Sequence, residues 1–214
     1  MSNDVYKQVF QNNQQWAEQM KGQHADFFDN LAKGQSPDFL FIGCSDSRVP
    51  ETQLMGLGPG QVFVHRNVAN VVSHTDDNIQ AVIEYAVNHL HVKHIVVCGH
   101  TSCGGVAAAM GNTDLGSLNG YLAQIRDVYY ANLDALEALE GEARYRRLIE
   151  LNVEAQCVNV IKSASVQQHW AQHDFPSVHG WVFDLSSGLL QDLDLDFDAV
   201  KGRIAERYAL SGNS

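Results

Sequence analysis

The sequence is poor in basic residues. Its 214 residues include 14 lysines and arginines against 25 aspartates and glutamates, so the formal net charge is −11. Nucleic acids and anionic membrane surfaces are bound through basic patches, and this charge balance argues against both as partners. A small or neutral substrate fits the sequence better.

Long apolar runs are also missing. No stretch reaches the length of a membrane-spanning helix, and the first residues lack the charged and then apolar segments of a signal peptide. We therefore expect a soluble protein that stays in the cytoplasm. With 45% hydrophobic and 18% charged residues, the chain can build one sizeable core, and we expect residues 1–214 to form a single domain.

Cysteine is scarce, with four residues in the chain, far below the density of a disulfide scaffold. In a reducing compartment, such cysteines serve metal binding or catalysis more often than disulfide pairing. Cys98 lies in an apolar run and Cys157 on a predicted helix, so we expect both in the core, where free cysteine behaves as a small hydrophobe. Cys44 and Cys103 have different surroundings.

Apolar strand-like runs alternate with helical patterns along the chain. The predicted strands are residues 38–43, 61–65, 93–98 and 178–185. The last of them turns at Ser186-Ser187-Gly188 into a hairpin that reaches residue 192. The predicted helices are residues 4–33, a helix from the cap at 74–77 to about 91, and residues 106–110, 117–139, 142–170 and 196–209. A turn-rich loop with several prolines and glycines is predicted between the first two strands.

This alternation predicts an α/β fold. Strands that are followed by helices form a mainly parallel central sheet with flanking helices, joined by right-handed crossovers. The hairpin at 178–192 adds an antiparallel edge strand, and the first helix is an extended N-terminal helix.

Three soft metal ligands follow apolar runs that stop at a glycine. Cys44 comes after Gly43, and His100 and Cys103 come after Gly99. The carboxyl ends of parallel strands line a common crevice, so two neighbouring strands would bring these side chains together. Two thiolates and one imidazole suit zinc far better than magnesium or calcium, and a Cys₂His set with an open fourth position is a catalytic zinc pattern. We therefore predict one zinc ion at these three residues.

Asp46 and Arg48 lie close to the predicted metal. The Asp46 carboxylate can bind the ion or accept a hydrogen bond from water on it, and the Arg48 guanidinium can clamp the carboxylate and decide between these roles. Zinc lowers the pKa of bound water to about 7 in catalytic sites. Two thiolates donate more charge than imidazoles do, so we expect a less acidified water and an activity that rises toward alkaline pH.

Three sequence blocks resemble the signature blocks of the β-class carbonic anhydrases. They are the runs Cys44-Ser45-Asp46-Ser47-Arg48, Phe63-Val64-His65-Arg66-Asn67-Val68-Ala69-Asn70 and Gly99-His100-Thr101-Ser102-Cys103-Gly104-Gly105. Shorter similarities at 33–37, 83–86 and 179–181 extend the resemblance over nearly the whole chain. It implies an enzyme that interconverts carbon dioxide and water with bicarbonate and a proton.

The resemblance also implies roles for single residues. By position, the zinc ligands are Cys44, His100 and Cys103, and the catalytic pair is Asp46 with Arg48. The residues that match the family's substrate pocket are Gln35, Phe63, Val68 and Tyr85. The resemblance further implies a homodimer or a dimer-of-dimers tetramer, with the cleft at the subunit interface and the N-terminal helix embracing the partner.

The family includes a pH-gated type, in which the aspartate closes onto zinc and bicarbonate binds a noncatalytic site formed by a tryptophan, an arginine and a tyrosine. The matching residues here are Phe41, Arg66 and Phe183. Phenylalanine offers neither an indole N–H nor a phenolic O–H. We therefore predict that this protein is not gated by bicarbonate, and that water rather than Asp46 takes the fourth position on zinc.

Two alternatives stay open at this stage. Similar proteins of this fold hydrolyse carbonyl sulfide or carbon disulfide through the same zinc chemistry, and the shape of the pocket decides between these substrates. The other alternative is a structural zinc site in a noncatalytic binding module, which normally has four protein ligands.

Overall fold

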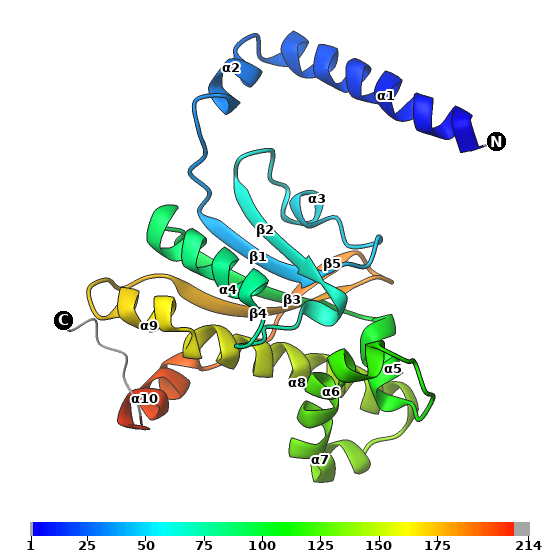
Figure 1. Cartoon of the computed structure of the whole chain (residues 1–214), viewed down its shortest axis with the longest axis vertical. Helices are drawn as coiled ribbons and strands as arrows, with labels where there is room; N and C mark the ends of the chain where they lie inside the picture. Colours follow the sequence, from blue (N-terminus) through cyan, green and yellow to red (C-terminus); the bar gives the residue numbers. More distant parts are fainter. Residues whose placement is uncertain (1, 208–214) are drawn as a thin grey trace. The chain divides into compact units, whose positions relative to one another are not determined.

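The computed structural model describes residues 2–207 of the chain, which folds as two compact units, Met1–Gln35 and Ser36–Ser214 (Figure 1). Within residues 2–207, no helix combines the length and the apolar character needed to cross a lipid bilayer. The smaller unit is helical and the larger one contains the sheet. Whether residues 1–214 act as one domain stays a prediction.

The N-terminal unit contains α1 (Ser2–Gln23) and α2 (Phe27–Leu31) rather than one helix over 4–33. Gly22, a weak helix former, precedes the break. The turn lets the ring of Phe28 pack edge-on against Trp16 of α1, with 5.6 Å between the ring centroids. The prediction of a single helix was therefore wrong at its C-terminal end, because aromatic packing favours the turn.

The larger unit is built on a five-stranded sheet in the order β2-β1-β3-β4-β5. The strands are β1 (Phe39–Cys44), β2 (Val62–Asn67), β3 (His94–His100), β4 (Ser177–Asp184) and β5 (Leu189–Asp192). The first four strands are parallel, and β5 pairs with β4 in the antiparallel sense. The predicted α/β fold with a mainly parallel sheet and an antiparallel edge is confirmed.

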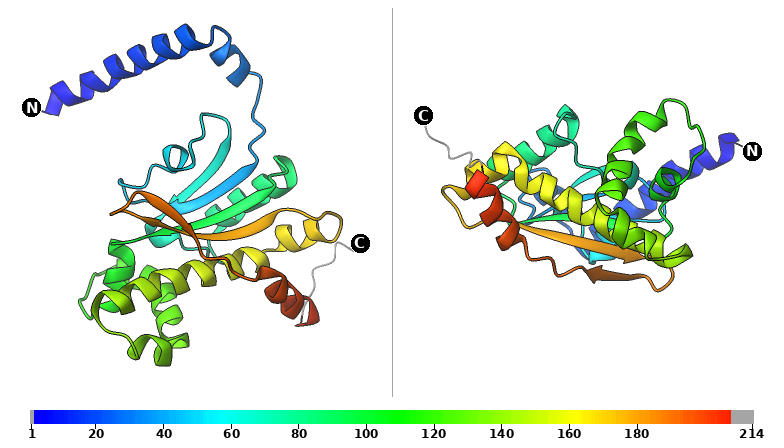
Figure 2. Two further views of the ribbon diagram at one scale, coloured as in Figure 1. Left: turned by 180° about the vertical axis from the view of Figure 1, so that it is seen from behind. Right: turned by 90° about the horizontal axis from the view of Figure 1, so that it is seen from below.

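Helices and short turns connect the first four strands, and one helix follows β5. They are α3 (Glu51–Met55), the 3₁₀ turn η1 (Val68–Asn70), α4 (Asp77–Glu84), the π turn η2 (Tyr85–His89), α5 (Gly104–Met110), α6 (Leu118–Ala131), α7 (Leu133–Glu137), α8 (Gly141–Lys162), α9 (Ala164–Trp170) and α10 (Phe197–Arg207). Figure 2 shows α8 running along one face of the sheet. The last two residues of the helix predicted over 196–209 lie outside the described part of the chain.

Three of these connections differ from the sequence prediction. The segment predicted as a loop contains α3, which ends at Gly56 in the left-handed conformation with φ 64°. The helices predicted over 117–139 and 142–170 are each divided in two, at Asn132 and Ser163. Both side chains bond a carbonyl four residues earlier, over 2.8 and 3.3 Å. Such side chains compete with the helix backbone, which is why an apolar pattern alone missed the breaks.

Both faces of the sheet are buried. On one face, strand residues such as Ile42 and Val97 pack with apolar residues of α4, α6 and α8. On the other face, Phe41 packs with a smaller cluster from β3, β4 and the segment around α3. This explains why the strands are continuous apolar runs rather than alternating patterns. Cys98 and Cys157 are fully buried, which confirms them as core residues.

The parallel register sets where the strand ends lie. β1 pairs with β3 so that Gly43 lies opposite Cys98, and with β2 so that Cys44 lies opposite Asn67. The carboxyl ends of these neighbouring strands therefore meet at one edge of the sheet. This is the edge at which parallel α/β sheets bind ligands.

A glycine allows β3 to approach α8 at this edge. A Cβ atom on Gly99 would lie 2.7 Å from Cγ2 of Val153 on α8, which requires backbone movement or an unfavourable rotamer.

We expect Gly99→Ala to lower the free energy of unfolding of the metal-free protein by about 1–3 kcal/mol, measured by urea denaturation. Gly120→Ala on α6 is the control, because nothing lies within 4 Å of its added methyl group. The control should gain about 0.5–1 kcal/mol in helix propensity. Equal stability of the two variants would contradict the packing argument.

Candidate metal centre

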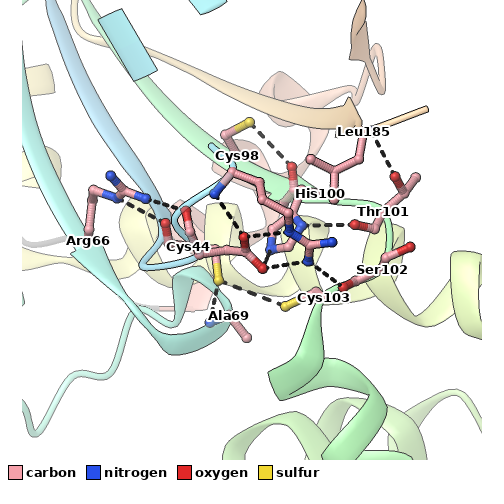
Figure 3. A network of polar contacts seen from close by, with 12 residues as sticks. Cys44, Arg66, Ala69, Cys98, His100, Thr101, Ser102, Cys103 and Leu185 are labelled. Atoms are coloured by element: carbon pink, nitrogen blue, oxygen red, sulfur yellow. Dashed lines mark hydrogen bonds and ion pairs between the residues drawn. The ribbon is translucent and has the colours of Figure 1, made fainter. Parts of the chain in front are cut away.

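Cys44, His100 and Cys103 converge at the carboxyl edge of the sheet (Figure 3). The first two are the last residues of β1 and β3, and Cys103 immediately precedes α5. All three are buried, and their ligand atoms lie within 4.8 Å of one another. The two sulfur atoms are 3.9 Å apart. Thiolates bound to one tetrahedral zinc at about 2.3 Å would be separated by about 3.8 Å, so the sulfur positions fit zinc.

The imidazole of His100 is oriented for metal binding. Its Nδ1 atom lies 2.8 Å from the carbonyl oxygen of Thr101, to which it donates its proton. Nε2 is then the free acceptor, and it is buried without a hydrogen-bond partner among the described residues. Metal-binding histidines typically use their second nitrogen in this way, which sets the tautomer and the ring orientation.

The two thiols interact strongly with each other. A hydrogen bond from the Cys103 thiol lowers the pKa of Cys44 to about 4, and the backbone N–H groups of Ala69 and Asp46 act in the same direction. The same contact raises the pKa of Cys103 far above its ordinary value, because a second buried thiolate would lie beside the first. A divalent cation removes this repulsion, so the chemistry of the donor set also fits a metal.

Asp46 and Arg48 lie beside the three ligands. The Asp46 carboxylate accepts hydrogen bonds from Nε and Nη2 of Arg48, at 2.9 and 2.7 Å, and from the Arg48 backbone N–H at 3.0 Å. These bonds hold the pKa of Asp46 well below its usual range. Oδ2 of Asp46 is 3.8 Å from Nε2 of His100. The structure thus brings the predicted pair together and keeps the carboxylate ionised next to the metal ligands.

Water can reach the outer side of this pair. The side chain of Arg48 is 53% exposed. It borders a cavity of about 330 Å³, which is also lined by Thr101, Ser102 and Arg146.

Arg66 holds the loop that carries Cys44 and Asp46. Its Nε donates to the carbonyl oxygen of Cys44 over 3.0 Å, and its Nη2 donates to that of Asp46 over 2.6 Å. Nη1 forms an ion pair with Glu51 at 3.3 Å. Sequence reasoning related Arg66 only to a bicarbonate site and missed this role. Arg66 can reach this loop because it lies opposite Gly43 in the β1–β2 register, and this register cannot be read from the sequence alone.

Three of the four predicted pocket residues belong to the larger unit, and the fourth, Gln35, belongs to the N-terminal unit. Phe63 on β2 and Tyr85 at the start of η2 are in ring contact, with 5.7 Å between centroids. Val68 is 38% exposed and follows β2 directly. Gln35 is an exposed residue of the N-terminal unit, and its part in a pocket with the other three stays a prediction.

Phe41 and Phe183 lie inside the protein. Both are buried in the smaller apolar cluster of the sheet, together with Val49, Val96 and Cys98. The positions that match the aromatic members of the family's bicarbonate site are therefore parts of an apolar core here. Burial also raises the pKa of the neighbouring Cys98 to about 12, so this thiol stays neutral.

Two further contacts to the metal ligands carry no sequence signal. The backbone N–H of Ala69 donates to Sγ of Cys44 over 3.4 Å, and the hydroxyl of Tyr145 donates to the carbonyl oxygen of Cys103 over 2.6 Å. A backbone donor is independent of residue type, and Tyr145 lies on a helix distant in sequence. Neither contact could be found without the three-dimensional structure.

The fold and the ligand set together define a class of protein. A parallel α/β sheet carries two cysteines and one histidine at its carboxyl edge, and among the described residues no fourth cysteine or histidine joins the group. Closed structural zinc sites have four protein ligands, whereas catalytic sites have three and an open position. The group of three matches the pattern of a catalytic metal site. The model of the carbonic anhydrase family matches residues 39–190, and the chain belongs to this family, in its β class.

Known relatives cover almost the entire chain. A carbonic anhydrase of Emericella nidulans is 52% identical over 211 residues, which are 98% of this chain and 92% of that protein. The crystal structure of the β-carbonic anhydrase CafA of Aspergillus fumigatus superimposes with a TM-score of 0.90 at 41% identity, covering 98% of this chain and 100% of that one. A tetrameric β-carbonic anhydrase of Sordaria macrospora gives a TM-score of 0.86 at 42% identity, covering 90% and 98%.

Zinc content tests the ligand set. We expect about one zinc ion per chain, measured by mass spectrometry of the metal after dialysis. Cys103→Ser should weaken zinc affinity by more than the roughly 10–100-fold that loss of an outer-shell partner costs. Cys98→Ala is the matched control, because that thiol is buried in the smaller apolar cluster, outside the group of three ligands. Retention of zinc by Cys103→Ser, or its loss from Cys98→Ala, would refute the assignment.

Proposed function

We propose that this enzyme reversibly hydrates carbon dioxide to bicarbonate and a proton, with one zinc ion held by Cys44, His100 and Cys103. The observation that carries the proposal is the convergence of three buried ligand atoms within 4.8 Å beside an arginine-bound carboxylate. Zinc, when bound, supplies a nucleophile near neutral pH by lowering the pKa of water to about 7. The two thiolates weaken that effect, so activity should rise toward alkaline pH.

Asp46 orients the nucleophile. Arg48 keeps the carboxylate of Asp46 ionised, so Asp46 can only accept hydrogen bonds. It therefore accepts one from the O–H group of the nucleophile. The oxygen lone pair then faces the substrate. Arg48 supports this geometry from two sides, since its guanidinium and its backbone N–H both bond the same carboxylate.

The substrate side of the site is apolar. Carbon dioxide has no net charge. The rings of Phe63 and Tyr85 and the side chain of Val68 offer it an apolar surface, which binds water only weakly. Gln35 would donate a hydrogen bond to a substrate oxygen. The assignment of these four residues to one pocket is part of the proposal.

The site is of the open type in this proposal. Support comes from three donors of Arg48 that already bond the Asp46 carboxylate and hold its orientation. Arg66 likewise bonds two carbonyl oxygens and Glu51. Positions 41 and 183 carry phenylalanine, whose side chain has no polar atom. These residues therefore form no bicarbonate site that would switch the enzyme off.

A zinc-loaded crystal structure tests the open type. At pH 7 and at pH 8.5, we expect two sulfur atoms, one nitrogen and one water oxygen around zinc, with Asp46 still bound to Arg48. X-ray absorption spectroscopy at the zinc edge, on the protein in solution, should give the same ligand count at both pH values. Coordination of zinc by Asp46 in either crystal would refute the open-type assignment.

Stopped-flow hydration of carbon dioxide tests the main proposal. Asp46→Asn should keep zinc and lower kcat by about 100-fold or more, the scale on which positioned acid–base groups contribute. Asp127→Asn on α6, an exposed aspartate, is the control and should keep full activity. A zinc-loaded wild type without hydration activity would sink the proposal. Faster turnover of carbonyl sulfide than of carbon dioxide would favour the alternative substrate class.

We also propose a homodimer or a dimer of dimers, in the cytoplasm. An apolar set on α1 is largely exposed in the single chain and supports a partner subunit: Val5, Tyr6, Val9 and Phe10. The Sordaria macrospora relative is tetrameric. The four cysteines are free and buried, which supports a reducing compartment.

A further inference from the structure

The segment after β2 has an unusual backbone. Ala69 and Asn70 have φ values of 59° and 49°, in the left-handed region that residues other than glycine rarely adopt. Both residues are buried, with 0% and 1% of their surface exposed. Such a conformation costs about 1–3 kcal/mol and persists only where the surrounding structure determines it. Specific contacts therefore hold this turn, which spans residues 68–72.

Helix α8 supplies one set of contacts. Nδ2 of Asn152 donates to the carbonyl oxygen of Ala69 over 3.0 Å, and Oε1 of Gln156 accepts from the N–H of Val72 over 2.8 Å. Gln156 also donates to Oδ1 of Asn152 over 3.1 Å, which fixes the orientation of that amide. Asn152 and Gln156 are 1% and 2% exposed. Buried amides are stabilising only when they are bonded, so these residues specify one position for the turn.

Two other elements, β2 and α6, also hold the turn. The side chain of Asn67 bonds both the N–H and the carbonyl oxygen of Val71, at 2.8 and 2.7 Å. The hydroxyl of Tyr121 donates to the carbonyl oxygen of Val68 over 2.8 Å. Side chains therefore bond the backbone along most of the turn.

One donor of the turn faces the metal centre. The N–H of Ala69 points to Sγ of Cys44 at 3.4 Å, and the carbonyl of the same residue is the group that Asn152 holds. We propose that Asn152, supported by Gln156, is a positioning residue that keeps the Ala69 N–H on the Cys44 thiolate and so tunes the charge this ligand gives to zinc. The inference rests on the zinc centre of the proposed function, and not on the substrate.

The expected effect follows from charge. A hydrogen bond to a metal-bound thiolate withdraws electron density from sulfur and leaves the ion more electrophilic. Because two thiolates donate strongly, a donor on one of them partly restores the Lewis acidity that a zinc enzyme needs. Asn152 would thereby adjust the metal without touching it.

Cobalt(II) substitution makes this charge visible, because the thiolate-to-cobalt absorption band moves to longer wavelength when sulfur is more electron-rich. In the cobalt-loaded full chain, Asn152→Leu should shift the band to longer wavelength. Its zinc affinity, measured by chelator competition, should fall about 10-fold, since an anionic ligand loses a donor that stabilises its charge. Gln156→Leu should give a smaller shift in the same direction.

Val160→Ala is the matched control. It removes buried apolar volume from α8 outside the amide pair, so it should lower the urea midpoint without moving the band. An unchanged band and unchanged zinc affinity in Asn152→Leu would overturn the positioning role alone. If that variant does not fold, the same criterion applies to Gln156→Leu. A wild type without any thiolate-to-cobalt band would overturn the zinc centre, and this inference with it.

Discussion

The parallel pairing of β1 with β3 is the constraint on which the site depends. Hydrogen bonds along the two strands place Gly43 opposite Cys98, and thereby bring the residues that follow, Cys44 and His100, to the same edge. A shift of register by one residue would turn the side chains of β1 to the opposite face. Both faces of β1 are packed, Ile42 in the larger cluster and Phe41 in the smaller one, and such a shift would exchange the two sets, so the apolar core fixes the geometry of a polar site.

Around this edge, each proposed metal ligand has a hydrogen-bond partner within the protein. Thr101 orients His100, Ala69 donates to Cys44, and Tyr145 bonds the carbonyl of Cys103. These partners come from different elements, and Asn152, which bonds the carbonyl of Ala69, is itself buried. The proposed ligands are thus held in place by folding, so that a metal ion would meet a nearly complete site.

The sequence predicted much of this arrangement, for reasons that are specific to certain residues. Apolar runs that end at Gly43 and Gly99 located the strand ends, and soft ligands placed just beyond them predicted the metal site. The breaks at Asn132 and Ser163 were missed because they depend on local side-chain bonds within an otherwise helical pattern. The contacts of Arg66 and Asn152 were missed because they link side chains to backbone atoms far away in sequence, which residue patterns do not record.

The three proposed ligands belong to two segments that unfolding would separate: the end of β1, which carries Cys44, and the end of β3 with the turn before α5, which carries His100 and Cys103. An ion held by all of them binds the folded chain far better than the unfolded one. It therefore adds to the free energy of unfolding by mass action, in an amount that grows with the logarithm of the free metal concentration. The supply of metal would then set the stability of the folded chain as well as the fraction of chains that are active.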